Sequence, residues 1–453
     1  MSTLPGFSLY FVSRCLLLAC FSLAVSDGLA QVPAHKKVVV ISLDGFPAYA
    51  FDDPRLPTPT LRRLIHEGTY AAMHPVNPTV TWPNHTAMVT GVTGATHHVL
   101  FNGLLERPAT GGHPVVEPWR DKDVMVYAPT VYDLAHQAGL TIAQVDWVAI
   151  YNAKTITWKF PERPDPDGEI EKDLIADGTA TREQIADFDE SSAAWRDQIW
   201  TDATIDILKK HHPDLMLFHL LNLDGMNHHY GPMTDASFTT MAYVDSKVQQ
   251  VLDALRESGD LERTAVLVVS DHGFRSFHHA IHANALLKER GWITNQDGKS
   301  SVAAWIVPEG GSAMVYISDP GRKKALMPQI HQAFAGVEGV DHVYDQEDYA
   351  KLGFPTAEAS DQSPDLFLTA KEDYAFMGGE EGAVVTPVEQ RGAHGYINSD
   401  PKMQPIFIAW GAGIRSGVKL ETISNIDVAP TIASLLGLKM THIEGHPLTS
   451  ILK

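Results

Sequence analysis

The chain has 453 residues, of which 44% are hydrophobic and 20% are charged, and its formal net charge is −20 at pH 7. A chain of this length exceeds one ordinary domain, but a large α/β enzyme can reach it around a single sheet. The hydrophobic content supports a substantial core, and so acidic a surface excludes a protein that coats nucleic acid.

Residues 1–30 differ in kind from the remainder. Arg14 precedes an apolar run from Leu16 to Val25, and Gly28-Leu29-Ala30 supplies small residues where a signal peptidase cuts. The run is short for a membrane span, so it predicts a cleaved signal peptide and a periplasmic or secreted protein with no stable membrane span. An uncleaved membrane anchor is the alternative.

Both cysteines, Cys15 and Cys20, lie in this segment. A lipoprotein formed through Cys20 is therefore a further alternative. The mature chain, residues 31–453, would have no cysteine, and hence neither a disulfide nor a thiolate metal site. This composition is typical of a bacterial periplasmic or secreted enzyme that relies on a large core.

The first half of the mature chain alternates strand and helix patterns. Val38–Leu43 is β-branched and apolar, which predicts a parallel strand buried on both faces, and it ends at Asp44. The next expected elements are a helix from about Thr60 to Gly68, a helix that begins at Pro83 and runs through Val89, a glycine-rich loop over 91–103, a helix over 131–138 and a strand over 141–145. Residues 146–189 are rich in proline and charge, and we expect an irregular insertion there.

The second half continues the alternation. The expected elements are a helix over about 191–210, a strand over 215–221, a helix with Met241 to Leu255 on its apolar face, a strand over 265–269, strands at 366–368 and 406–409, and a helix over 428–436. A small inserted subdomain is predicted over about 275–361, with helices near 285–290 and 330 and a strand over 313–317. The pattern indicates an α/β fold with a mostly parallel sheet.

Three predicted strands are followed by aspartate. Asp44 follows the first strand, Asp224 follows the strand that ends at Leu221, and Asp271-His272 follows the strand that ends at Val269. In an open parallel sheet, ligands bind beyond the carboxyl ends of the strands, so these side chains are expected to converge. Aspartate and histidine together suit zinc or a similar divalent ion.

Two further histidines strengthen this prediction. His228 lies four residues after Asp224, which places both on one side of a helical turn. His394 lies in a glycine-flanked loop. A single aspartate at a strand end is more often a turn or cap residue, but the conjunction indicates a metal centre. Most of the 22 histidines are expected to be surface or packing residues, and we expect His85 to make a structural hydrogen bond.

Thr81 precedes the predicted helix start at Pro83, so it should lie against the positive end of a helix. A threonine hydroxyl hardly ionises near neutral pH, so Thr81 would need a metal ion at its oxygen to act as a nucleophile. A phosphate-bearing substrate would also need local positive charge, which divalent cations could supply to this acidic chain.

Several motifs run in order over nearly the whole mature chain: Ser42-Leu43-Asp44-Gly45-Phe46, Thr79-Val80-Thr81-Trp82-Pro83-Asn84-His85, Thr90-Gly91, Asp224 with His228-His229-Tyr230-Gly231-Pro232, Ser270-Asp271-His272-Gly273, Gly392-Ala393-His394-Gly395-Tyr396, Met403-Gln404-Pro405-Ile406-Phe407 and Asn425-Ile426-Asp427-Val428. Through them the sequence resembles the nucleotide pyrophosphatase/phosphodiesterase family of the alkaline phosphatase superfamily. The resemblance implies an alkaline-phosphatase-like three-layer sandwich, with a mostly parallel central sheet and helices on both faces.

The resemblance also implies a site. Two zinc ions are expected, one held by Asp224, His228 and His394, and the other by Asp44, Asp271 and His272 with Thr81 as its nucleophilic ligand. Asn102 matches the position of an asparagine that hydrogen-bonds a phosphoryl oxygen in the family. The implied reaction is hydrolysis of phosphodiester or pyrophosphate bonds through a phospho-threonine intermediate.

The chain departs from the family at Trp82, where phenylalanine is usual, and at His98, where glycine is usual. The Trp82 ring could stack on a nucleobase or form a plain pocket wall. Trp82 and Tyr151 are therefore the candidate substrate-binding aromatics, and small nucleotide esters and pyrophosphates are the expected substrates.

Three alternatives stay open. A phosphate monoesterase of the same superfamily would add a lysine and an arginine, for which Lys159 and Arg163 are the candidates, in surroundings that do not match. Phosphonate hydrolysis would use the same metals and threonine. A non-catalytic periplasmic binding protein is the third alternative, and the complete ligand set argues against it. The sequence does not determine the oligomeric state.

Overall fold

The computed structural model of the chain describes residues 36–108, 112–296, 299–319 and 321–453. The predicted signal peptide and both cysteines lie outside the described residues. None of the described helices is both long enough and apolar enough to cross a membrane.

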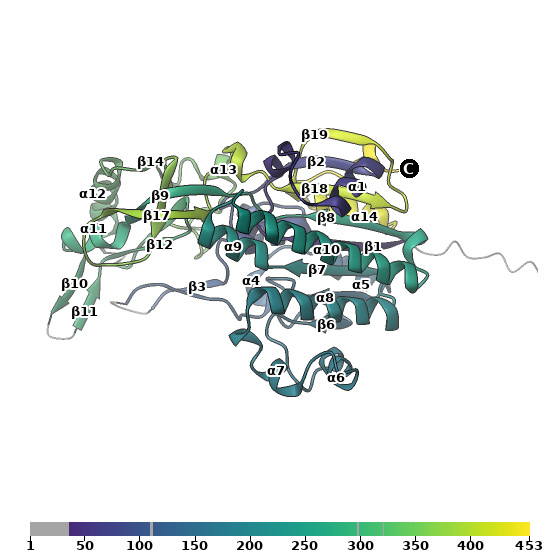
Figure 1. The fold of residues 1–453 in the computed structure, drawn as a ribbon. Coiled ribbons are helices and arrows are strands. Elements are labelled where there is room, and N and C mark those ends of the chain that lie inside the picture. The colour runs from purple at the N-terminus through teal and green to yellow at the C-terminus, as the bar shows by residue number, and fades with distance from the viewer. Residues whose placement is uncertain (1–35, 109–111, 297–298, 320) are drawn as a thin grey trace, which may run out of the picture. The chain divides into compact units, whose positions relative to one another are not determined.

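An eight-stranded sheet organises the described chain, in the order β19-β2-β18-β8-β1-β7-β5-β6 (Figure 1). Its strands are β1 (Lys37–Leu43), β2 (Thr69–His74), β5 (Ile142–Val145), β6 (Trp158–Phe160), β7 (Leu215–Leu220), β8 (Thr264–Val269), β18 (Ile406–Gly411) and β19 (Val418–Ser424). Neighbouring strands are parallel except in the two pairs that β18 makes. The predicted α/β class with a mostly parallel sheet is confirmed.

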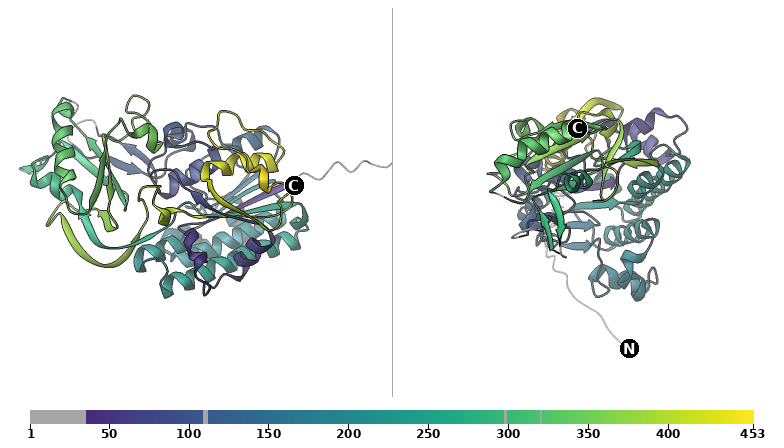
Figure 2. Two further views of the ribbon diagram at one scale, coloured as in Figure 1. Left: turned by 90° about the horizontal axis from the view of Figure 1, so that it is seen from above. Right: turned by 90° about the vertical axis from the view of Figure 1, so that its left-hand side faces the viewer.

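Helices cover both faces of this sheet (Figure 2). Alternate residues of β1 belong to two separate cores, with Val39 and Ile41 in one and Val38 and Val40 in the other, as the two-residue period of a strand requires. The first core also contains residues of α1 (Pro59–Glu67), α6 (Glu169–Ala176), α8 (Ala193–Lys210) and α10 (Asp235–Glu257). The second contains residues of α2 (Thr81–Thr90), α5 (Val131–Gln137) and α14 (Val428–Leu435).

The chain leaves this sheet after β8 and returns to it at β18. Between them it forms a three-stranded sheet, β16-β9-β17, and a four-stranded sheet, β12-β13-β15-β14. The bounds are β9 (Arg275–His282), α11 (Ala283–Glu289), β10 (Ile293–Gln296), β11 (Lys299–Val302), β12 (Ala304–Pro308), β13 (Ser312–Ile317), α12 (Lys323–Ala335), β14 (Val340–Tyr344), α13 (Tyr349–Leu352), β15 (Leu366–Ala370), β16 (Asp373–Met377) and β17 (Val385–Ala393). A third hydrophobic core lies among them.

The expectation of an irregular insertion over 146–189 is wrong. The segment contains the edge strand β6, then α6 and α7 (Arg182–Ala186). A three-residue strand is too short to show a period of two, and prolines separate it from the helices. A local signal for α7 was present, because Thr181 and Gln184 form a capping box at its start.

Two smaller expectations also need correction. The helix α2 begins at Thr81, two residues before Pro83, with Val80 as its N-cap. Pro83 is still in the first turn, where backbone N–H groups have no partner within the helix. The loop over 91–103 contains the short helix α3 (Gly94–His97). The other short elements are β3 (Leu104–Glu106), β4 (Val115–Glu117) and α4 (Lys122–Met125).

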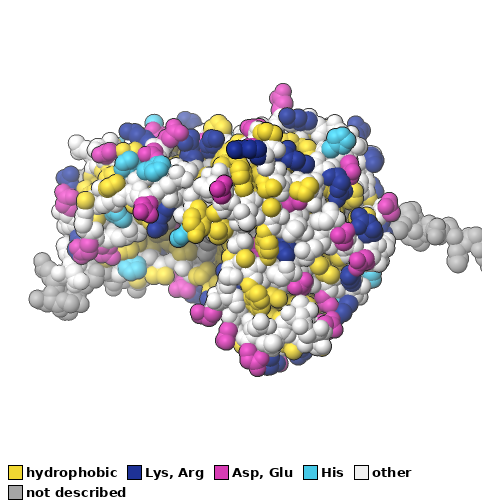
Figure 3. Space-filling model, in the orientation of Figure 1, with side chains coloured by type: hydrophobic (Ala, Val, Ile, Leu, Met, Phe, Trp, Pro, Cys, Tyr) yellow, Lys and Arg dark blue, Asp and Glu magenta, His cyan; other side chains and the backbone are white. Residues whose placement is uncertain are grey.

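On the face drawn in Figure 3, Asp and Glu side chains are scattered among Lys and Arg side chains. They do not gather into one large patch of a single sign there. The acidic balance of the chain is therefore spread over this face, which favours solubility rather than a dedicated electrostatic interface.

Candidate active site

The carboxyl ends of three adjacent strands bring the predicted ligands together. In the order β8-β1-β7, Ser42 pairs with Val269 on one side and with His219 on the other. Asp44 comes directly after β1. Because these strands are parallel, the residues that follow them meet at one edge of the sheet.

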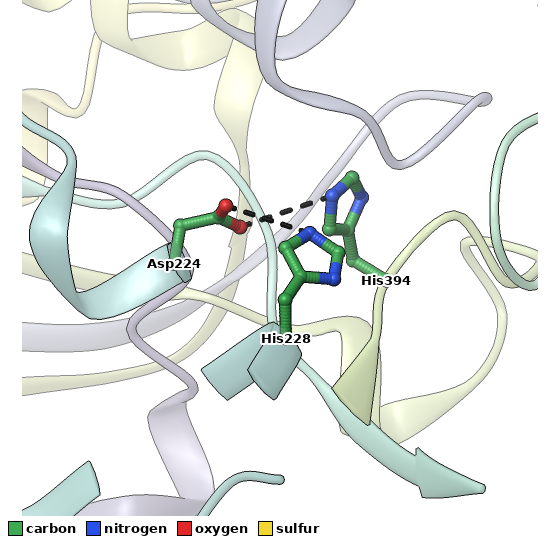
Figure 4. A group of neighbouring side chains, drawn as sticks. All are labelled: Asp224, His228 and His394. Carbon is green, nitrogen blue, oxygen red and sulfur yellow. Dashed lines mark ion pairs between the residues drawn. The ribbon is translucent and has the colours of Figure 1, made fainter. Parts of the chain in front are cut away.

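The first group, here called the Asp224 cluster, consists of Asp224, His228 and His394 (Figure 4). Asp224 and His228 lie one turn apart on α9 (Asn222–Tyr230), and His394 follows β17. The Nε2 atom of His228 is 3.4 Å from Asp224 Oδ2, and Nε2 of His394 is 3.8 Å from Asp224 Oδ1. The side chains point toward one another, as three ligands of one ion would.

The second group, the Asp44 cluster, consists of Asp44, Asp271 and His272, and all three are buried. Nε2 of His272 is 3.5 Å from Asp44 Oδ1 and 3.1 Å from Asp271 Oδ2. The two clusters adjoin, because the rings of His272 and His394 stack with their centroids 3.7 Å apart. The structure thus brings the six predicted Asp and His ligands together in one place.

The three histidines make the same kind of hydrogen bond through Nδ1. Nδ1 of His228, His272 and His394 lies 3.1, 3.2 and 2.9 Å from the carbonyl oxygens of Gly392, Gly273 and Thr79. A carbonyl oxygen can only accept, so each Nδ1 carries the proton and Nε2 presents a lone pair to the carboxylates. Burial lowers the pKa of His272 and of His394 well below the usual value, which favours the neutral form that binds metals.

Position 395 requires glycine for a steric reason. Its φ is +82°, and a Cβ there would come within 1.7 Å of the carbonyl oxygen of Glu309. Only glycine takes this conformation without strain at so close an approach. The turn after His394 therefore depends on this residue.

Three carboxylate oxygens in the clusters are buried and have no hydrogen-bond partner among the described residues: Asp44 Oδ1, Asp224 Oδ1 and Asp271 Oδ2. An unpaired buried carboxylate is costly. Burial, reinforced by Asp271 and Asp224, raises the pKa of Asp44 well above its usual value, and burial raises that of Asp224 to about 6. A divalent cation in each cluster would supply the missing partners, so the residues fit the two-metal expectation. An Asp/His donor set of this kind suits zinc.

Thr81 stands beside these clusters, at the first position of α2. Its Oγ1 is 3.4 Å from Nε2 of His272. Asn102 lies next to it, because its Oδ1 accepts the backbone N–H of Trp82 at 3.0 Å. This hydrogen bond uses the amide oxygen of the exposed Asn102 side chain and leaves its NH₂ group as a donor beside Thr81.

His85 makes the structural hydrogen bonds expected of it. One ring nitrogen is 2.9 Å from the carbonyl oxygen of Thr81, and the other is 2.8 Å from Oγ of Ser42. The ring is fully buried, and burial lowers its pKa to about 3. His85 therefore holds the first turn of α2 against the end of β1.

The predicted aromatics Trp82 and Tyr151 do not contact each other directly, because Trp119 stands between them. Its ring is 6.5 Å from that of Trp82 and 6.4 Å from that of Tyr151, edge-to-face in both cases. All three line a cavity of about 390 Å³. Trp119 was missed from the sequence, where nothing marks it off from the other eight tryptophans.

Two more residues of the site were missed. His219 Nε2 is 3.0 Å from Asp44 Oδ2, and His219 Nδ1 is 2.9 Å from Asp146 Oδ2. Burial alone would lower the pKa of His219, but the hydrogen bonds and charges of Asp146 and Asp44 raise it well above the usual value. One signal was present, because His219 is the one titratable residue in the otherwise apolar strand β7.

The sequence matches the family described as type I phosphodiesterase / nucleotide pyrophosphatase over residues 38–397. The ectonucleotide pyrophosphatase/phosphodiesterase family member 7 of Mus musculus is 22% identical over 440 residues, which cover 95% of this chain and 91% of the relative. A bis(5'-adenosyl)-triphosphatase of Homo sapiens is 24% identical over 421 residues, covering 91% and 80%.

The solved structure of murine ectonucleotide pyrophosphatase/phosphodiesterase 5 has a TM-score of 0.71 with this chain at 18% identity, covering 92% of this chain and 100% of that one. This likeness confirms the predicted fold. A further murine structure is of an inactive threonine-to-alanine variant in complex with AMP. With a family match over most of its length and two candidate metal-binding clusters beside a threonine, the chain belongs to the type I phosphodiesterase/nucleotide pyrophosphatase family.

Proposed function

We propose that this protein is a two-zinc phosphodiesterase and nucleotide pyrophosphatase that acts through a covalent phospho-Thr81 intermediate. Membership of the family makes it a hydrolase of phosphodiester or pyrophosphate bonds. The observation that carries the finer proposal is the position of Thr81, whose hydroxyl lies 3.4 Å from His272, where the two clusters meet.

The Asp224 cluster and the Asp44 cluster are the proposed zinc sites. Each offers three Asp/His ligands. The fourth position would go to Thr81 Oγ1 at the Asp44 cluster and would stay open for substrate at the Asp224 cluster, as in catalytic zinc sites. Bound zinc would lower the pKa of a hydroxyl and stabilise negative charge on phosphoryl oxygens.

In the proposed reaction, Thr81 gives up its hydroxyl proton to solvent and Oγ1 attacks the phosphorus atom. A P–O bond forms while the leaving oxygen departs with the bonding electron pair and takes up a proton from solvent where its pKa requires one. Water then attacks phospho-Thr81, restores the threonine hydroxyl and releases the phosphorylated product. The Asn102 NH₂ group donates to a phosphoryl oxygen in both steps. The N-terminus of α2 favours the negative charge that gathers beside Thr81. The inactive threonine-to-alanine variant of the murine relative supports a catalytic threonine.

Small nucleotide esters and pyrophosphates are the proposed substrates, with a nucleoside monophosphate as product. The aromatic walls formed by Trp82, Trp119 and Tyr151 offer faces and edges against which a base can pack. The human relative is named for hydrolysis of a dinucleoside triphosphate, and the murine relative was solved with AMP.

Diesters are proposed to be better substrates than monoesters. A monoester dianion needs an additional cation, and Arg163 is already engaged, 3.0 Å from Asp189 Oδ2 and stacked over Trp119 at 4.2 Å. Among the described residues, neither lysine nor arginine forms an ion pair with either cluster.

The test compares kcat/KM for a diester, a monoester and a phosphonate ester that share one leaving group, using zinc-loaded protein. The diester should be turned over fastest. A monoester advantage would assign the protein to the phosphatases, and a phosphonate advantage to the phosphonate hydrolases. Zinc binding without turnover of any of the three would favour the binding-protein alternative.

The compartment is part of the proposal. We infer that residues 1–30 are removed on export and that residues 31–453 act in the periplasm or outside the cell. The intact mass of the mature protein from its native host tests this inference. A chain that keeps residues 1–30 would contradict it, and an added lipid on Cys20 would indicate the lipoprotein instead.

A further inference from the structure

We propose that Asp146 and His219 position Asp44, so that the Asp44 cluster binds its metal before the Asp224 cluster and more tightly. The inference rests on the two-metal assignment proposed above. It concerns metal affinity rather than turnover, and it can therefore be tested by itself.

A chain of hydrogen bonds links the three residues. His219 is 2% exposed, in the interior of the central sheet. Its ring lies between two carboxylates, 3.0 Å from Asp44 Oδ2 and 2.9 Å from Asp146 Oδ2. The ring also packs edge-to-face on His85, with centroids 4.8 Å apart. The His219 ring is thus held through both of its nitrogen atoms and by its contact with the His85 ring.

Asp146 is held in an unusual backbone conformation. It follows β5 directly and has a φ of +56°, in the left-handed region that residues other than glycine rarely adopt. Its N–H donates to the carbonyl oxygen of Phe160 at 3.0 Å. A left-handed backbone is strained for a residue other than glycine and persists where the surrounding structure imposes it. Here that conformation directs the buried carboxylate to His219.

These contacts decide which oxygens the Asp44 cluster presents. His219 occupies Asp44 Oδ2, which leaves Oδ1 facing Nε2 of His272 at 3.5 Å. The second carboxylate is arranged in the same way, because Asp271 Oδ1 accepts the N–H of Gly45 at 3.1 Å and Oδ2 faces His272. In each aspartate, one carboxylate oxygen therefore accepts a hydrogen bond from a residue outside the cluster, and the other oxygen is available for a metal.

The Asp224 cluster lacks this support. Within the described part of the chain, no residue outside the cluster donates a hydrogen bond to the Asp224 side chain, and its ion-pair partners are His228 and His394. The His228 side chain is also 43% exposed, whereas that of His272 is fully buried. Ligands that are already oriented lose less freedom when a metal binds, so the Asp44 cluster should have the higher affinity.

The experiment titrates chelator-stripped full-length protein with Zn²⁺ against a chromophoric chelator. Wild-type protein should bind in two steps, and His228→Ala should remove the weaker step, which assigns it to the Asp224 cluster. His219→Leu should raise the Kd of the tighter step by about 10–100-fold and leave the weaker step unchanged. His219→Gln keeps an N–H donor for Asp44 and should recover most of the affinity.

His219→Leu leaves Asp146 unpaired, and the variant could fail to fold. Asp146→Asn then serves in its place, because asparagine keeps the shape of the side chain but weakens the hydrogen bond to His219. This variant should also raise the Kd of the tighter step. His212→Gln is the matched control. It removes another histidine–aspartate pair, with Asp260 at 2.9 Å, just before the same strand β7, and should leave both steps unchanged.

Three results would overturn the inference: a tighter step that belongs to the Asp224 cluster, equal shifts of both steps in His219→Leu, or no recovery in His219→Gln. Normal two-step zinc binding together with no hydrolysis of any phosphate ester would refute the proposed function and leave this inference intact.

Discussion

Substitution of Thr81 by alanine should separate the contribution of this residue to catalysis from its contribution to folding. Thr81 is the first residue of α2 and not its N-cap, which is Val80, so no capping hydrogen bond depends on its side chain. Among the described residues, its hydroxyl has one side-chain hydrogen-bond partner, Nε2 of His272 at 3.4 Å. The folded structure should therefore tolerate the change.

The two expected effects differ greatly in size. Removal of one buried methyl group and a weakly bonded hydroxyl should lower the free energy of unfolding by about 1 kcal/mol. Loss of a covalent nucleophile should lower kcat by at least about 10,000-fold, which corresponds to about 5 kcal/mol of transition-state stabilisation. Chemical denaturation measures the first effect and steady-state kinetics on an aryl diester measures the second, while the zinc content shows whether the metal sites are intact.

Thr90→Ala is the matched control. Thr90 is also buried on the same helix, and its hydroxyl donates to the carbonyl oxygen of Thr86 at 2.7 Å, away from both clusters. It should lose comparable stability and keep wild-type turnover. If Thr81→Ala retains more than a tenth of the wild-type kcat with normal zinc content, Thr81 is not the nucleophile.

Three further outcomes are expected. Elemental analysis of protein purified without chelators should give about two zinc ions per chain, and a reproducible value near one with full activity would refute the two-metal proposal. Trp82→Ala should raise KM for a nucleotide more than for a small aryl diester, and equal effects would make Trp82 a plain pocket wall. Asp245→Ala should lower the free energy of unfolding by about 1–3 kcal/mol, because the Asp245 carboxylate accepts the N–H groups of Thr60 and Leu61 at 3.0 and 2.7 Å. Unchanged denaturant midpoints would contradict that role.

Much of the fold could be predicted from local patterns. The buried strand that ends at Leu43, the helix that ends at Gly68 and the long amphipathic helix before Gly259 all match elements of the structure. A strand that is buried on both faces requires an uninterrupted apolar run. A helix that is buried on one face requires apolar residues at the helical period, so both elements can be recognised from the sequence. The expectation failed over 146–189, where short elements are held by tertiary contacts.

The candidate metal ligands were predictable for a related reason. Asp44 comes directly after an apolar strand, and Asp271 comes two residues after the end of another. Asp224 and His228 have the spacing of one helical turn, so chain position alone indicates a shared edge of a parallel sheet. His394 has no such relation to the others in the sequence. It was found through its motif.

What surrounds those ligands was decided by the tertiary structure. His219 and Asp44 are 175 residues apart in sequence and meet because β7 and β1 pair with Ser42 opposite His219. A shift of one residue in that register would turn His219 to the other face of the sheet. Trp119 likewise reaches Trp82 only through the folding of an intervening loop. The sequence by itself determined which side chains could bind a metal, whereas strand register and loop packing determined which neighbours hold them, because those contacts depend on long-range pairing that no local pattern records.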